Sequence, residues 1–450
     1  GDRVAISAPL DDDGGSNAGH IRVYEYDGTA PSAPSGLAVS SYYQGASLSW
    51  TANSESDLAK YYVYTSTDNS TYTKYSTEPT TNSISISDLT GGTKYYYKIS
   101  AVDNASNEST KSSAVSITAS RTWWVDSKDG DDDNDGKASA SSFKTIQKAI
   151  ESNSSLTGGD TVKVKPSLAS DGTLSYYDFG GDAINTSTNF VLISRGGPDS
   201  TIIDAESKNR HFYLSGSSQD STHQIVGFTF RNGKETNGGS FYLSGTEVKP
   251  VFKDCVFKDN LAENTEGYAY GGAIYSNFEG SASSMASKPM KFYRCKFIGN
   301  MAKAEQTAYG GAFYIGKSAE FFNCLFDSNA AIGGIDIDDN ECCGNAYGGA
   351  GWASPQWYSS TASRWQGGKV TFKNCTFVDN NVESKESNRE VYGAAIALGW
   401  DYDKKLYMLN SIIWGSRAIR NGSDWSDIDL NRLHLDKESG TNHKFIMNYS

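Results

Sequence analysis

The sequence has no apolar stretch long enough to cross a bilayer as a helix, which needs about 20 predominantly apolar residues. Basic residues are also outnumbered by acidic ones, and the formal net charge is −13. Nucleic-acid binding depends on clustered Lys and Arg side chains. The composition therefore predicts neither a membrane-spanning segment nor a nucleic-acid partner, and it suits a secreted, salt-tolerant or calcium-rich setting.

Cysteine is scarce, with six residues in the chain, and their spacing is not that of a small disulfide-stapled protein. Four of the six recur at one position of a repeat, where we expect buried free thiols because bridges between stacked strands are geometrically awkward. The other two, Cys342 and Cys343, are adjacent in an acidic loop. Either a strained vicinal disulfide or two ordinary thiols fits that pair.

Histidine is scarce too, and none of the five lies in a repeated strand with a carboxylate at fixed spacing. Glycoside hydrolysis needs a pair of carboxylates, and a lyase needs a positioned base. No Asp-Asp pair lies in a predicted strand and no Gly-His-Gly is present, and the basic residues of the repeat strands, such as Arg294 and Lys296, fit a solvated outer face. We therefore assign no catalytic residue and favour a protein that is not an enzyme.

The chain does contain one pattern written four times, Phe-x-x-Cys-x-Phe-x-x-Asn followed by Tyr-Gly-(Gly/Ala)-Ala. Such self-similarity is typical of a solenoid, whose coils stack equivalent residues about 4.8 Å apart. No helix-length apolar pattern separates the copies, which favours short strands joined by turns. The predicted ladders are Cys255, Cys295, Cys324 and Cys375; Phe257, Phe297, Phe326 and Phe377; and Asn260, Asn300, Asn329 and Asn380.

A strand at Trp123–Asp126 precedes the repeats, followed by an acidic turn and the segment Phe143–Ile150. In that segment Ile146, Ala149 and Ile150 have the i, i+3, i+4 spacing of a short amphipathic helix. Because a solenoid must cover its open end, we expect this helix to cap the first coil.

The tetrads that begin at the four ladder phenylalanines match an FxxN motif, and Gly271–Ile274 and Gly310–Phe313 match a GGA(I/L/V) motif. Together they resemble the repeats of chlamydial polymorphic outer-membrane proteins and of bacterial pectin-lyase-like proteins. The resemblance implies an all-β fold, a right-handed parallel β-helix (solenoid) over residues 121–450 that is truncated at its C-terminus.

Residues 29–120 alternate apolar and polar side chains in short runs, with Trp50 as the expected core residue and Leu89-x-x-Gly92-x-x-Tyr95 as a tyrosine corner. This segment resembles a fibronectin type III β-sandwich. Residues 1–28 resemble part of an FG-GAP-type β-propeller repeat, which cannot fold without its neighbours. We therefore expect a fragment of a larger multidomain chain, or a monomer.

Two sets of side chains are candidate binding sites. Tyrosines at one repeat position, with two loop tryptophans, would bind a polysaccharide or cell-surface glycan if exposed, and would only pack the fold if buried. Alternate carboxylates ahead of Gly136 match the first half of a calcium loop, and the alternative is an acidic turn ahead of the capping helix. The candidates are Tyr270, Tyr309, Tyr347, Tyr392, Trp352 and Trp357 for glycan, and Asp131, Asp133 and Asp135 for Ca²⁺.

The combination predicts a secreted or cell-surface β-helix protein, adhesin-like and without catalytic activity. Two alternatives stay open: a polysaccharide lyase or glycoside hydrolase of pectin-lyase-like fold, and an architectural stalk. Fold analogy alone supports the enzyme, because one fold hosts many functions.

Overall fold

The computed structural model describes residues 3–8, 20–25, 27–42, 45–151, 159–166, 183–216, 222–245, 248–277, 289–334, 344–359, 364–386, 389–399, 405–420, 423–424, 433–435 and 444–448. The chain divides into two compact units, residues 1–121 and 122–450. None of the helices within the described ranges is long and apolar enough to span a membrane.

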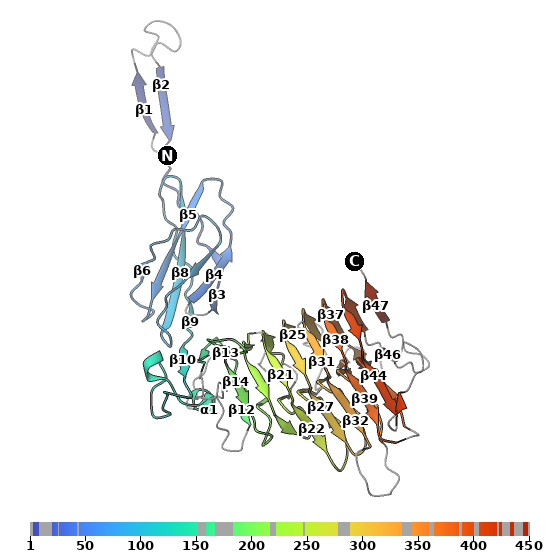
Figure 1. Ribbon diagram of the computed structural model, residues 1–450. Helices are drawn as coiled ribbons and strands as arrows, with labels where there is room; N and C mark the ends of the chain where they lie inside the picture. Colours follow the sequence, from blue (N-terminus) through green and yellow to red (C-terminus); the bar gives the residue numbers. More distant parts are fainter. Residues whose placement is uncertain are drawn as a thin grey trace. The chain divides into compact units, whose positions relative to one another are not determined.

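The first unit begins with a hairpin, in which β1 (Arg3–Ala8) pairs antiparallel with β2 (His20–Glu25). A two-sheet sandwich of seven strands follows it (Figure 1). One sheet contains β3 (Ser35–Tyr42), β4 (Gly45–Thr51) and β7 (Ser83–Ile86). The other contains β5 (Leu58–Ser66), β6 (Thr73–Lys74), β8 (Lys94–Asp103) and β9 (Val115–Thr118).

Alternating side chains fill the space between the two sheets. Trp50 is 4% exposed, and its ring meets Tyr61 edge-on with centroids 5.1 Å apart. The Thr90 N–H donates to the Tyr95 hydroxyl oxygen at 3.1 Å, which closes the expected tyrosine corner.

The second unit starts with a cap. It comprises the 3₁₀ helix η1 (Ser139–Ser141) and the short helix α1 (Ile146–Glu151), which packs on β10 (Thr122–Val125) and β11 (Thr161–Val164). Ile146, Ala149 and Ile150 are buried in the same core as Trp123 and Val162. The amphipathic spacing thus does cover the first coil, as the sequence predicts.

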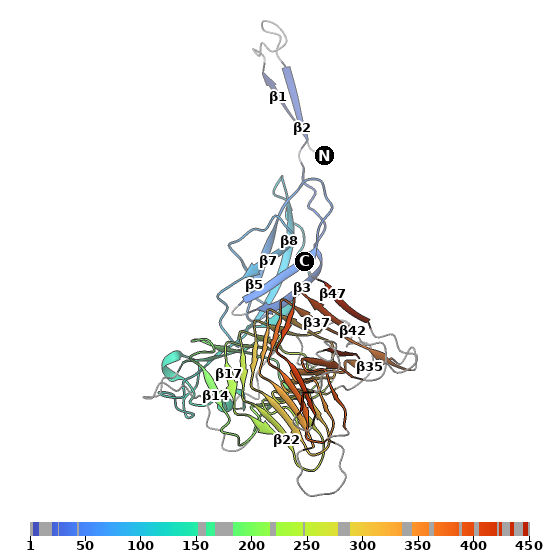
Figure 2. The same ribbon diagram turned by 45° about the vertical axis from the view of Figure 1, so that its right-hand side comes forward.

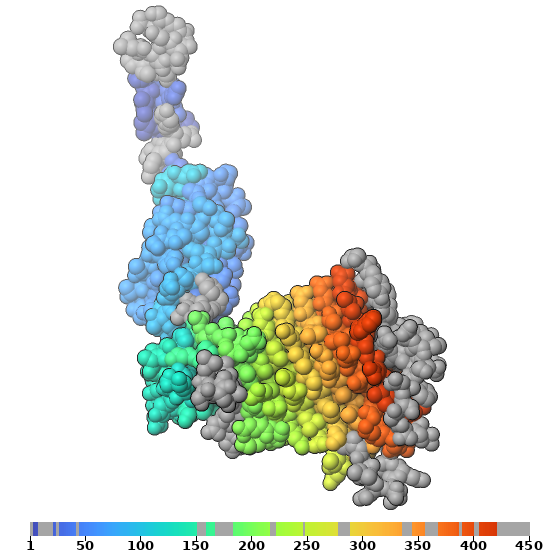
Figure 3. Space-filling model, viewed as in Figure 1, coloured from blue at the N-terminus to red at the C-terminus, as the bar shows by residue number. Residues whose placement is uncertain are grey.

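Beyond the cap, the chain winds into a parallel β-helix whose described strands form five sheets. Figure 1 and Figure 3 show successive coils side by side, from green to red along the unit. Except for β45 (Ser423–Asp424), which runs antiparallel to β44 (Arg417–Arg420), every strand in these sheets pairs parallel with its neighbours. The all-β solenoid fold is therefore confirmed.

Neighbouring parallel strands of a sheet come from successive coils. Sheet 1 contains β10 (Thr122–Val125), β11 (Thr161–Val164), β13 (Val191–Ser194), β16 (Gln224–Val226), β20 (Val251–Lys253), β25 (Met290–Tyr293), β30 (Ala319–Phe322), β37 (Lys369–Lys373), β42 (Lys405–Leu409) and β47 (Lys444–Asn448). Its last three strands lie side by side in Figure 2. Sheet 2 contains β14 (Ile202–Asp204), β17 (Thr229–Arg231), β21 (Val256–Lys258), β26 (Lys296–Ile298), β31 (Leu325–Asp327), β38 (Thr376–Val378) and β43 (Ile412–Trp414).

The other sheets complete the coil. Sheet 3 contains β18 (Lys234–Glu235), β22 (Leu261–Asn264), β27 (Met301–Ala304), β32 (Ala330–Gly333), β39 (Asn381–Ser384), β44 (Arg417–Arg420) and β45 (Ser423–Asp424). Sheet 4 contains β23 (Ala269–Tyr270), β28 (Ala308–Tyr309), β33 (Ala346–Tyr347) and β40 (Val391–Tyr392). Sheet 5 contains β12 (Ile184–Thr186), β15 (Phe212–Leu214), β19 (Phe241–Leu243), β24 (Ile274–Ser276), β29 (Phe313–Ile315), β34 (Gly351–Ala353), β41 (Ile396–Leu398) and β46 (Leu433–Leu435). A separate hairpin joins β35 (Gln356–Ser359) to β36 (Arg364–Gly367).

Stacked phenylalanines fill the interior of the coil. Phe257, Phe297, Phe326 and Phe377 are in register, fully buried, and stacked with ring centroids 4.6–4.9 Å apart. Burial of each ring contributes about 2–3 kcal/mol.

A column of buried asparagines turns the corner between sheet 2 and sheet 3. Each of Asn260, Asn300 and Asn329 donates its side-chain N–H to the amide oxygen of the next asparagine, at 2.8–2.9 Å. Buried amides hydrogen-bonded in this way lock the register of one coil on the next.

Candidate functional site

The four tyrosines of the repeat form one column on the outside of sheet 4, here named the first tyrosine column. Tyr270, Tyr309, Tyr347 and Tyr392 are in register, and neighbouring rings stack with centroids 5.1, 5.3 and 6.0 Å apart. The residue after each tyrosine is a glycine with φ between +61° and +70°. A Cβ on Gly271 would lie 2.0 Å from the Ile274 carbonyl oxygen, so the bend requires glycine.

Exposure differs along the first tyrosine column. Tyr270, Tyr309 and Tyr392 are half-buried, whereas Tyr347 is 1% exposed and donates its hydroxyl to Glu390 Oε2 at 2.5 Å. Trp352 is 3% exposed. The predicted glycan contact does not hold for Tyr347 and Trp352, because their rings have no open face. Trp357 lies on β35, and its side chain is outside the described residues.

Burial also affects the phenol groups of this column. It raises the pKa of Tyr270 and raises that of Tyr309 well above the usual range. Both phenols therefore stay neutral at physiological pH and keep a hydroxyl that can donate or accept a hydrogen bond.

A second column of aromatic residues, not recognised from the sequence, runs along the outside of sheet 5. We name Tyr213, Tyr242, Tyr275 and Tyr314 the second tyrosine column; strand register places them in line, and Trp352 follows them. Each occupies the middle of a tripeptide whose two flanking residues are buried. Alignment of these tripeptides, residues 212–214, 241–243, 274–276 and 313–315, would have found the column.

The cysteine ladder is buried and offers no reactive site. Cys255, Cys295, Cys324 and Cys375 are free thiols, each at most 3% exposed. Their Sγ atoms lie 3.3–3.7 Å from main-chain carbonyl oxygens. Burial raises the pKa of the Cys295 thiol well above its ordinary value, which suppresses the nucleophilic thiolate.

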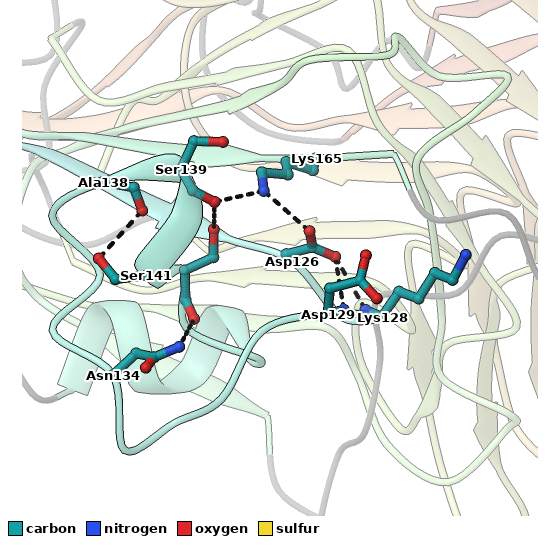
Figure 4. A network of polar contacts seen from close by, with 9 residues as sticks. Asp126, Lys128, Asp129, Asn134, Ala138, Ser139, Ser141 and Lys165 are labelled. Carbon is teal, nitrogen blue, oxygen red and sulfur yellow. Dashed lines mark hydrogen bonds and ion pairs between the residues drawn. The ribbon is translucent and has the colours of Figure 1, made fainter.

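The acidic turn at the start of the solenoid is organised by a buried carboxylate (Figure 4). Asp126 accepts the N–H groups of Lys128 and Asp129, both at 3.1 Å, and the ammonium of Lys165 at 3.1 Å. Burial raises the pKa of Asp126, but the Asp129 N–H and Lys165 outweigh it and the net shift is downward. Lys165 also donates to the Ser139 carbonyl oxygen at 2.6 Å, which links β11 to η1.

Asp132 has a structural role that the sequence pattern did not reveal. Its carboxylate accepts the N–H groups of Lys144 and Thr145 at 2.8 and 2.9 Å, and the Thr145 hydroxyl at 2.9 Å. It thus accepts the N–H groups of the two residues that directly precede α1, although it lies 12 or 13 residues away in the sequence. No local capping signature spans that distance.

The alternate carboxylates proposed for calcium are exposed, and they make turn hydrogen bonds. Asp131 accepts the Asp133 N–H at 3.0 Å, and Asp135 accepts the Lys137 N–H at 3.1 Å and the Ser141 hydroxyl at 2.7 Å. Within the described residues they form no group of three converging carboxylates. A cation at this turn would have to replace some of these bonds.

A hollow of about 350 Å³ opens beside the same turn. Acidic, basic and aromatic side chains line it together, so it has neither a single sign of charge nor an apolar floor. The lining residues include Trp123, Phe143, Asp132, Asp133, Asp135 and Lys148.

Three carboxylates do converge in the first unit, where sequence reasoning placed no site. Asp27, Asp57 and Asp103 each offer an oxygen atom, and these atoms all lie within 4.8 Å of one another. Asp103 also accepts the backbone and side-chain N–H groups of Asn107, both at 2.8 Å. Asp27 and Asp57 lie in two separate loops and Asp103 is the last residue of β8, so no spacing along the sequence marks them.

Some expectations fall on residues outside the described ranges. They include the adjacent Cys342 and Cys343, whose thiol or disulfide state stays open.

Comparison with known proteins identifies one part of the chain. Residues 32–118 match the family model of the fibronectin type III domain. No curated protein matches the chain. Among solved structures, an Fn3-like protein from Clostridium thermocellum is 31% identical, with 21% of this chain and 97% of that chain covered and a TM-score of 0.19.

A second solved structure is a β-1,2-glucanase from Parabacteroides distasonis, at 28% identity and a TM-score of 0.18. The match covers 23% of this chain and 16% of the glucanase chain, so this chain spans less than a fifth of that enzyme.

Proposed function

We propose, from the premise that residues 32–118 belong to the fibronectin type III family and precede a long parallel β-helix, that this chain is a non-catalytic binding protein. In this proposal the β-helix binds a polysaccharide or a cell-surface glycan, and the fibronectin domain is a spacer. The protein would act outside the cell or on its surface, as an adhesin does, and its FxxN and GGA(I/L/V) repeats would place it among bacterial pectin-lyase-like proteins.

One observation carries the proposal. The first tyrosine column keeps three half-buried rings, Tyr270, Tyr309 and Tyr392, on one outer edge of the solenoid. An amphipathic ring with a neutral hydroxyl combines an apolar face with a hydrogen-bonding group, which suits the alternating faces of a sugar. Because Tyr270 and Tyr309 lie on successive coils and Tyr392 lies two coils further along the column, the surface suits an extended ligand rather than a single small molecule.

The test is a glycan-binding array run beside an activity screen on neutral and uronate-containing polysaccharides. We expect binding by the intact chain, weakened in Tyr270→Ala and Tyr309→Ala, with no product released from any polysaccharide. Tyr407→Ala is the matched control, because Tyr407 is a half-buried tyrosine on sheet 1. Release of product would overturn the non-catalytic role, and absence of any bound glycan would overturn the binding role.

Calcium binding by Asp131, Asp133 and Asp135 is a further part of the proposal. Its support is the exposure of the three carboxylates and their alternation along a turn ahead of Gly136.

A further inference from the structure

The second tyrosine column meets the first at an outer corner of the solenoid. Tyr270 lies between two of its members, with ring centroids 5.6 Å from Tyr275 and 5.1 Å from Tyr314. One coil further, Tyr309 meets Trp352 at 5.0 Å. The two columns thus form one continuous aromatic surface that spans the bend between sheet 4 and sheet 5.

This surface is more open toward the earlier coils. Tyr213, Tyr242, Tyr270 and Tyr275 are half-buried, and Tyr268, 6.3 Å from Tyr270 between ring centroids, is 46% exposed. Tyr314, in the later coils, is 8% exposed, and Trp352 and Tyr347 are still more buried. We name the open part the open tyrosine surface; it consists of Tyr213, Tyr242, Tyr268, Tyr270, Tyr275 and Tyr309.

Along the second column, ring contacts continue from coil to coil. The centroids of Tyr213 and Tyr242 are 5.0 Å apart, those of Tyr242 and Tyr275 are 4.9 Å apart, and those of Tyr275 and Tyr314 are 5.2 Å apart. The spacing follows the coil spacing of about 4.8 Å. A ligand that touches several rings must therefore be linear and lie along the solenoid axis.

Charged groups in contact with these rings are already paired. The Arg210 guanidinium lies 5.0 Å from the Tyr242 ring centroid; it bonds the Glu235 carboxylate at 3.2 Å and the Asn237 carbonyl oxygen at 2.8 Å. Glu390, which acts electrostatically on Tyr309, accepts the Tyr347 hydroxyl. The open tyrosine surface therefore presents ring faces and phenol hydroxyls, with Arg210 paired to Glu235 and Glu390 hydrogen-bonded by Tyr347.

We infer that the open tyrosine surface binds an uncharged linear polysaccharide, laid along the solenoid axis across both tyrosine columns. The inference rests on the proposed glycan-binding function and narrows it, because a polyuronate would need cations aimed at its carboxylates. In this arrangement Tyr242 and Tyr275 determine specificity as much as the repeat tyrosines do.

The experiment measures affinity for a neutral glucan and a polyuronate of matched length, by calorimetry, at two salt concentrations. Tyr242→Ala and Tyr275→Ala should each weaken binding of the neutral glucan by about tenfold or more. Tyr293→Ala is the control, since Tyr293 lies on sheet 1 and stacks on Phe322 at 5.0 Å. Affinity for the neutral glucan should not change with salt, because no ion pair contributes to it.

The outcomes separate the inference from the proposed function. Binding that is lost in Tyr270→Ala and kept in both second-column variants would overturn the inference and leave the proposed function standing. Preference for the polyuronate, weakened by salt, would also overturn it. If the intact chain binds no glycan at all, the proposed function itself fails. Melting curves show whether each variant is folded, and Tyr242→Phe, which keeps the ring, should retain binding.

Discussion

The side-chain N–H of Asn300 donates to Oδ1 of Asn329 at 2.9 Å, and the backbone N–H of Asn300 donates to the same oxygen at 3.0 Å. Asn329 lies one coil further along the solenoid. One amide oxygen thus satisfies two buried donors of the neighbouring coil, and the same arrangement joins Asn260 to Asn300. The asparagine column therefore connects coils through side chains in addition to the strand hydrogen bonds.

Asn300→Ala should lower the free energy of unfolding by about 2–5 kcal/mol, because it leaves the two donors of Asn260 buried without an acceptor. Urea titration followed by circular dichroism measures the change. Asn381→Ala is the control: Asn381 is half-buried on sheet 3, and its loss should cost less than about 1 kcal/mol. Equal effects of the two substitutions would show that the column carries no special stability.

The ladder thiols should not react with a thiol reagent at pH 8 until the β-helix unfolds. All four are at most 3% exposed, so none is accessible to the reagent, and burial also raises the pKa of the Cys295 thiol. The measurement uses a background with Cys342→Ser and Cys343→Ser, with and without denaturant. Fast reaction of the native protein would contradict the buried ladder.

Stability should fall as the pH is lowered from about 6.5 to about 4 because of His211. Its Nε2 lies 3.0 Å from the Ile203 carbonyl oxygen and its Nδ1 lies 3.0 Å from Ser240 Oγ. Burial lowers the pKa of His211 from 6.5 to about 4. The unfolded chain therefore binds a proton in this window that the native protein does not, which costs about 3 kcal/mol by pH 4. Well above pH 6.5 His211 is neutral in both the native and the unfolded chain, and its contribution to the free energy of unfolding is fully present.

His211→Gln tests this window, because glutamine does not titrate there. The difference in unfolding free energy between the parent and the variant, measured from pH 7.5 to pH 4, should shrink as the pH falls. A difference that stays constant with pH would mean that His211 does not titrate in this range.

Millimolar Ca²⁺ should raise the melting temperature if Asp131, Asp133 and Asp135 bind it, since a ligand that binds only the native state stabilises that state. Asp133→Asn should remove most of the increase, whereas Asp259→Asn, at an exposed carboxylate outside this turn, should keep it. An unchanged melting temperature in Ca²⁺ would count against the site and favour the turn hydrogen bonds as the whole role of these carboxylates.

The repeat in the sequence was sufficient to predict the vertical alignment of particular residues. Phe257 and Phe297 occupy the same place in two copies of one pattern, and parallel strands of equal length place such residues in register. The tyrosine tripeptides of sheet 5 follow the same rule, but they fall outside the most regular part of the motif, so the repeat does not predict them.

The sequence by itself therefore determined the solenoid, its ladders and its cap, because these depend on short-range periodicity that recurs with each coil. Only the tertiary structure decided that Tyr347 is buried while Tyr270 is half-exposed, that Asp132 supports α1, and that Asp27, Asp57 and Asp103 converge. The physical reason is that exposure and convergence depend on segments that do not repeat, and on contacts between residues far apart in the chain. Periodicity carries no information about either.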